Sequence, residues 1–123
     1  MNATTPSVIP ELTNDTFWQF VQTYRFVIIH FWAQWNGYDV EMLRLLQCQV
    51  KSPINIARFE IDPPKHHDIC RLHKVLNVPF LALYQDGLLI DSITGILPFR
   101  FKPNQPKYCP FRPWSVFRRR YGE

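Results

Sequence analysis

The sequence lacks several features that would point to common classes of protein. Its longest apolar stretch, residues 26–33, is only strand-length and contains a histidine, whereas a membrane-spanning helix needs about 20 apolar residues. Only 4 of its 123 residues are glycine, which effectively excludes a glycine-rich loop around a phosphate. The N-terminus has neither a basic start nor an apolar block, so we expect no secretory signal.

Cysteine is scarce as well. The three cysteines, Cys48, Cys70 and Cys109, are widely spaced and form no CxxC pair. This pattern is typical of reduced thiols in the cytosol rather than of a secreted disulfide framework, so we expect a cytoplasmic protein. The sequence neither favours nor excludes a disulfide bridge from Cys109 to Cys48 or to Cys70. The sequence also shows no Ser/His/Asp triad and no paired-carboxylate pattern.

The charges fall into two unequal parts. The net charge is +4. Residues 1–95 contain seven Lys or Arg against nine Asp or Glu, whereas residues 96–123 contain seven against one. The second part also holds five of the eleven prolines. We therefore predict a near-neutral globular domain at residues 1–95, followed by a basic, proline- and aromatic-rich tail at residues 96–123.

Alternating helix and strand patterns predict an α/β domain with a mixed central sheet and helices on both of its faces. Thr13, Asn14 and Asp15 are expected to cap the first helix. Asp86-Gly87 joins the last two strands and is the strongest hairpin signal in the chain. The predicted elements are helices at 17–24, 40–50 and 63–76, and strands at 26–32, 54–61, 80–84 and 88–93.

The spacing of apolar residues also predicts which faces of two helices are buried. Asp62-Pro63 should start the third helix, because an Asx cap precedes a proline at the first helical position. The apolar pattern expected to face the core is Val40, Leu43, Leu46 or Gln47, and Val50 in the second helix, and Ile69, Leu72 and Leu76 in the third.

Four segments together resemble the thioredoxin family. Residues 27–35 (VIIHFWAQW) resemble the strand that leads to its active-site loop, and residues 56–62 (IARFEID) resemble its next strand. Residues 77–80 (NVPF) resemble its cis-proline loop, and Asp86-Gly87 its last hairpin. The resemblance covers about residues 11–95 and implies a thioredoxin-like three-layer fold. The family's final helix is replaced by the tail, where prolines every three to five residues forbid a regular helix.

The resemblance does not extend to the family's dithiol. Where the family has Trp-Cys-Gly-Pro-Cys, this sequence has Trp35, Asn36, Gly37, Tyr38 and Asp39. Thiol–disulfide exchange needs a thiolate and a resolving thiol, and neither Asn nor Asp can replace them. We therefore expect no thiol–disulfide oxidoreductase activity and no cofactor.

The residues around the missing dithiol differ from the family too. His30 stands where the family has a buried carboxylate, and Arg58 where it usually has a lysine. Asn36 is a good helix N-cap, and Asp39 can bond back to the cap or complement the helix dipole. The substitutions thus predict a capped helix without thiol chemistry.

The same region is the predicted binding surface for another protein or an extended peptide segment. In the family, the proline loop aligns extended partner segments through backbone hydrogen bonds, which needs no sulfur. Aromatic residues are favoured anchors at interfaces, and we expect Trp35, Tyr38 and Phe80 to form a rim around a shallow groove. The predicted surface consists of Trp35, Asn36, Gly37, Tyr38, Asp39, Val78, Pro79 and Phe80.

Two alternatives rest on other residues. A cationic neighbour, His67 or His73, could lower the pKa of Cys70 and create a monothiol oxidoreductase. His66, His67, Cys70 and His73 could also share one helix face as metal ligands. Structural metal sites usually draw ligands from two elements, so we expect a solvated histidine face and no metal.

The tail supports a third hypothesis. Its interleaved basic and aromatic residues, ending in RRRY at 118–121, could bind RNA or single-stranded DNA by phosphate contacts and stacking. An anionic lipid surface would attract the same charges. A solvated tail without a ligand has the same composition.

Overall fold

The computed structural model describes residues 9–47 and 54–95. The elements are five strands and three α-helices, the third helix being preceded by a short 3-10 helix. They are β1 (Glu11–Leu12), α1 (Phe17–Thr23), β2 (Phe26–Trp32), α2 (Tyr38–Gln47), β3 (Asn55–Glu60), η1 (Pro64–His66), α3 (His67–Leu72), β4 (Phe80–Gln85) and β5 (Leu88–Thr94).

The strands form one mixed sheet in the order β1-β3-β2-β4-β5. β1, β3 and β2 run parallel, whereas β4 is antiparallel to β2 and β5 is antiparallel to β4. The predicted mixed sheet is therefore confirmed, together with all four predicted strands. β1 was not predicted, because two residues are too few to show a periodic pattern.

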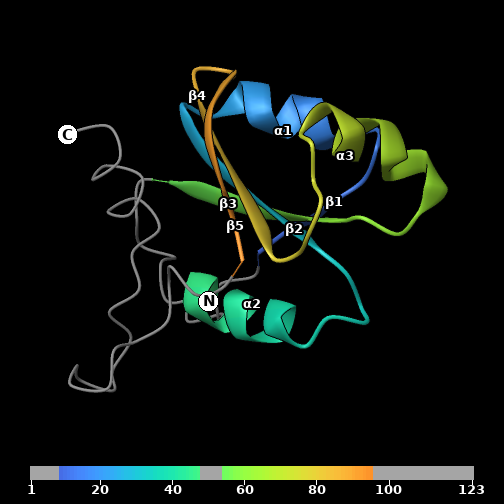
Figure 1. The fold of residues 1–123 in the computed structure, drawn as a ribbon. Helices are drawn as coiled ribbons and strands as arrows, with labels where there is room; N and C mark the ends of the chain where they lie inside the picture. Colours follow the sequence, from blue (N-terminus) through green and yellow to red (C-terminus); the bar gives the residue numbers. More distant parts are fainter. Residues whose placement is uncertain (1–8, 48–53, 96–123) are drawn as a thin grey trace, which may run out of the picture.

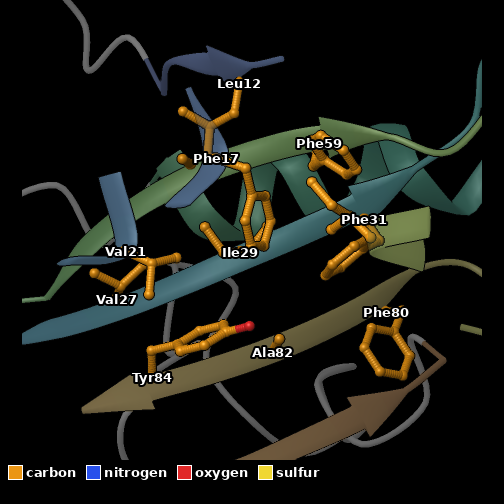
Figure 2. Packing of buried hydrophobic residues seen from close by; sticks show 12 residues of the cluster. Leu12, Phe17, Val21, Val27, Ile29, Phe31, Phe59, Phe80, Ala82 and Tyr84 are labelled. Carbon is orange, nitrogen blue, oxygen red and sulfur yellow. The ribbon is translucent and has the colours of Figure 1, made fainter. Parts of the chain in front are cut away.

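Helices cover both faces of this sheet, as predicted: α1 and α3 lie on one side and α2 on the other (Figure 1). The face under α1 and α3 carries a cluster of aromatic and aliphatic side chains, including Phe17, Phe31 and Phe59 (Figure 2). A second cluster joins Met42 and Leu46 of α2 to the opposite face. β2 is buried along five of its seven residues because both clusters pack against it.

Two predicted helix starts are displaced in the structure. The N-cap residue of α1 is Thr16, which makes no capping bond with its side chain. Of the three predicted caps, Thr13 does accept with its side chain, since its Oγ1 accepts from the Asp15 N–H in the turn before the helix. The third helical segment begins at Pro64 rather than at Pro63, so Asp62 is not its N-cap.

The buried face of α2 is also offset from the prediction. Asp39, Met42 and Leu46 are buried, while Val40 is exposed. The helix starts at Tyr38, two residues earlier than expected, and Asp39 turns inward because it has buried polar partners. Residues 48–53, and with them the predicted end of this helix, lie outside the described residues.

The α3 helix ends earlier than predicted. Lys74 has a left-handed φ of 57°. The Lys74 N–H donates to the Arg71 carbonyl, and the Val75 N–H donates to the Cys70 carbonyl. These two bonds close the helix as a Schellman motif. Leu76 therefore lies beyond the helix and is 88% exposed rather than buried as predicted. Leu72, the last residue of α3, is also exposed, contrary to the prediction.

The two loops implied by the resemblance are present. Asp86 and Gly87 have φ angles of 53° and 82°, the left-handed pair that a type I′ hairpin turn requires. The peptide bond between Val78 and Pro79 is cis. Within the described residues, no helix is long and apolar enough to cross a membrane.

Candidate functional site

The candidate site lies where β2 ends and α2 begins, beside the loop that leads into β4. Asn36 joins these parts. Its side-chain Nδ2 donates to the Val78 carbonyl at 2.6 Å, and its Oδ1 accepts from the Tyr38 N–H at 2.9 Å. Asn36 therefore satisfies the first residue of α2, as expected of a capping residue, and also holds the cis-proline loop.

Asp39 was predicted on the surface, but only 1% of it is exposed. Its Oδ1 accepts from His30 Nε2 at 2.8 Å, and its Oδ2 accepts from the Ala33 N–H at 3.0 Å. A buried carboxylate needs such donors to offset its loss of hydration. Asp39 thus holds the start of α2 against β2 from inside the fold and is not part of the exposed surface.

His30, the partner of Asp39, is fully buried in the middle of β2. Burial lowers the pKa of His30 because the charged ring loses its hydration, and the hydrogen bond that His30 donates to Asp39 opposes this shift only in part. The Nδ1 atom of His30 has no hydrogen-bond partner among the described residues. His30 and Asp39 thus form a buried hydrogen-bonded pair in which the imidazole Nε2–H donates to the side chain of Asp39.

Two aromatic side chains are exposed above this buried pair. Trp35 is 69% exposed and Tyr38 is 52% exposed, and Gly37 between them is exposed as well. Trp35 Nε1 donates to Asp62 Oδ1 at 3.2 Å, which ties the indole to the loop after β3. The exposed part of the predicted surface is thus formed by Trp35, Gly37 and Tyr38, and Trp35 is fixed by its hydrogen bond to Asp62.

The side chains of the cis-proline loop are not on this surface. Val78, Pro79 and Phe80 are all buried, and Phe80 packs edge-on against Phe31 with ring centroids 5.4 Å apart. The predicted three-residue aromatic rim is therefore wrong for Phe80, because the first residue of β4 belongs to the core. The loop faces Asn36 with its backbone.

A polar cluster missed by the sequence analysis lies at the neighbouring edge of the sheet. The guanidinium of Arg58 stands over the Trp32 ring, 4.1 Å from its centroid, and Trp32 Nε1 donates to Glu11 at 2.6 Å. Burial raises the pKa of Glu11 and lowers that of Arg58. Arg58 is also the β3 neighbour of His30, so its charge further disfavours a protonated imidazole.

The histidines near α3 have separate structural roles. His66 Nδ1 donates to the Glu60 carbonyl and His67 Nε2 to that of Asp62. His73 Nδ1 donates to the Ile69 carbonyl, and its Nε2 accepts from the Tyr84 hydroxyl. The expected solvated histidine face is wrong for His66 and His73, which are buried.

These side chains do not converge on a metal or on the thiol. No group of three His, Cys, Asp or Glu residues in the described segments is arranged to hold a metal ion. Burial raises the pKa of Cys70 to about 11, the opposite direction from that of an activated thiol. Cys48 and Cys109, and with them the disulfide bridge left open for Cys109, lie outside the described residues.

The fold and the position of this site together define a thioredoxin-like domain, and comparison with known proteins agrees. The family model for thioredoxin matches residues 8–100. The chain therefore belongs to the thioredoxin family.

Individual relatives show how far the similarity reaches. A thioredoxin from Coprinus comatus is 30% identical over 95 residues, covering 68% of this chain and 81% of that protein. The oxidised mitochondrial thioredoxin 3 of Saccharomyces cerevisiae superimposes with a TM-score of 0.64 at 28% identity, over 71% of this chain and 83% of that one.

Longer relatives contain a similar segment. Protein disulfide-isomerase of Saccharomyces cerevisiae is 25% identical over 112 residues, which are 81% of this chain and 21% of that protein. Monothiol glutaredoxin-S17 of Arabidopsis thaliana is 25% identical over 72 residues, or 58% of this chain and 15% of that protein. The chain thus spans about a fifth or less of these two relatives.

Proposed function

We propose that this thioredoxin-family chain is a redox-inactive, non-catalytic module that binds an extended segment of another protein. The proposal rests on the two positions where the family has cysteines, which are occupied here by Asn36 and Asp39. Asn36 and Asp39 are both engaged in hydrogen bonds that hold the site together. The surface beside them keeps two exposed aromatic side chains, Trp35 and Tyr38.

The backbone of the cis-proline loop supports an extended partner. Within the described residues, the Val78 N–H makes no hydrogen bond, and Pro79 has no N–H. A backbone donor next to a strand can pair with a carbonyl of an added extended segment. Trp35 and Tyr38 offer apolar area close to the loop, because Asn36 connects the loop to the start of α2.

The monothiol alternative has less support. The Cys70 thiol lies on α3 and is half-buried, and burial raises its pKa to about 11. Only a small fraction is then thiolate near neutral pH, and the thiolate is the attacking species. The hydrogen bonds of His67 and His73 go to backbone carbonyls and to Tyr84, not to this sulfur.

The first prediction concerns disulfide reduction. In an insulin-reduction assay with dithiothreitol, the protein should give the rate measured without protein, because no thiol occupies the site. A dithiol thioredoxin serves as the positive control. A rate well above this baseline that is lost in the Cys48/Cys70/Cys109 triple serine variant would contradict the proposal and support the monothiol alternative.

The second prediction concerns binding. Peptides selected on the wild-type protein from a random phage-displayed library should lose about thirtyfold in affinity for Trp35→Ala, since an aromatic anchor contributes about 2 kcal/mol. Tyr38→Ala should also weaken binding. Tyr24→Ala is the matched control, because Tyr24 is similarly exposed but follows α1. Failure to select any peptide, or unchanged affinity in both site variants, would overturn the proposed function.

The domain division and the localisation belong to the same proposal. We take residues 1–95 as the binding domain and residues 96–123 as a separate basic tail, which lies outside the described residues and whose charge suits an anionic partner. The scarcity and wide spacing of cysteine favour a cytoplasmic protein.

A further inference from the structure

The backbone acceptors of the cis-proline loop are already occupied. The Val78 carbonyl accepts from the Asn36 side chain at 2.6 Å, and the Pro79 carbonyl accepts from the Gly95 N–H at 2.7 Å. These two contacts differ in kind. The Gly95 bond joins two segments of backbone beside the β4–β5 ladder, whereas the Asn36 bond depends on a single side chain.

An extended partner pairs through both groups of one residue. In an antiparallel hydrogen-bonded pair, the two facing residues exchange both N–H···O bonds. At Val78 the N–H is available for such a pair, but the carbonyl is held by Asn36. A partner strand that pairs with Val78 therefore approaches a carbonyl beside which the Asn36 amide already lies.

The amide of Asn36 is well placed to hold this carbonyl. Its oxygen accepts from the Tyr38 N–H, which orients the NH₂ group toward the loop, and the residue is only partly buried. The Val78 carbonyl consequently stays satisfied while no partner is bound, which avoids the cost of an unpaired polar group.

We propose that Asn36 is a self-blocking residue, whose side-chain amide occupies the Val78 carbonyl and must be displaced before an extended protein segment pairs with the loop. This inference rests on the proposed function. It reverses the role expected of Asn36 from the sequence, because the residue opposes binding instead of contributing a contact.

The test compares variants that separate the two hydrogen bonds of Asn36. In Asn36→Ser, a shorter side chain keeps an oxygen for the first turn of α2 but cannot span to the Val78 carbonyl. In Asn36→Asp, the shape and the capping oxygen remain while the donor is lost. Asn77→Ser is the matched control, since Asn77 is exposed in the same loop.

One peptide, selected on the wild-type protein, is titrated against all four proteins by calorimetry. Asn36→Ser should bind it about three- to tenfold more tightly, the equivalent of one hydrogen bond no longer displaced. Asn36→Asp should change the affinity in the same direction, and Asn77→Ser should leave it unchanged. Equal or weaker binding by Asn36→Ser overturns the self-blocking role but leaves the proposed function intact.

A second measurement tests the contact without any partner. In NMR spectra of the free wild-type protein, the side-chain NH₂ protons of Asn36 should exchange with water more slowly than those of Asn77. Equal exchange rates would overturn the inference, because the Val78 carbonyl would then not be held. Absence of peptide binding to every variant would overturn the proposed function, and the self-blocking role with it.

Discussion

Asp39→Ala is expected to lower the free energy of unfolding by about 2–6 kcal/mol, because each buried donor left unsatisfied costs about 1–3 kcal/mol. The substitution leaves two buried donors without their acceptor, His30 Nε2 and the Ala33 N–H. The free energy of unfolding of a domain of this size is only about 5–15 kcal/mol, so the variant should retain little stability. Urea unfolding followed by circular dichroism measures the change.

Three companion variants make this result interpretable. Asp39→Asn keeps an oxygen for one of the two donors and should cost less than Asp39→Ala. Asp68→Ala removes an exposed carboxylate that pairs with Arg71, and should cost no more than about 1 kcal/mol. His30→Leu combined with Asp39→Leu should cost less than the two single changes together. A loss below about 1 kcal/mol for Asp39→Ala would mean that the pair contributes little.

The parts of the fold that could be predicted are those with a repeating or local signal. The four long strands follow from runs of β-branched and aromatic residues, and the hairpin from Asp86-Gly87, whose left-handed conformations depend on those two residues alone. The end of α3 had no such signal, because Lys74 is an unusual residue for the left-handed position that closes it. Leu76 was therefore placed in a helix that had already ended.

The candidate site was predictable in position but not in its internal contacts. The sequence located the loop after β2, and the capping role of Asn36 followed from its residue type. The burial of Asp39 depends on His30 in a neighbouring element, and helix preferences alone favoured an exposed carboxylate near the N-terminus. The available signal was His30 itself, because a histidine within a buried strand requires a polar partner. Likewise, the bond from Asn36 to Val78 joins residues 42 positions apart, which no local pattern reveals.

The second large effect is expected for Phe17→Ala, which should lower the free energy of unfolding by about 3–5 kcal/mol. Phe17 is the first residue of α1, is fully buried and packs against Phe59 at 5.0 Å and Phe31 at 6.1 Å between ring centroids (Figure 2). Its removal leaves a cavity between the helix and two adjacent strands, and α1 has few other buried anchors.

Phe17→Leu separates the cavity from the loss of ring contacts. Leucine retains much of the buried apolar volume, so it should cost clearly less than alanine, while Gln22→Ala, an exposed change on the same helix, should stay within about 0.5 kcal/mol. The ring contacts of Phe17 are with core side chains and do not include Trp35 or Tyr38, so peptide affinity at the site should be unchanged in every variant that remains folded. A Phe17 variant that is folded yet binds peptide less tightly would show that the core under α1 and the site are coupled, and stability and binding could not then be treated as separate.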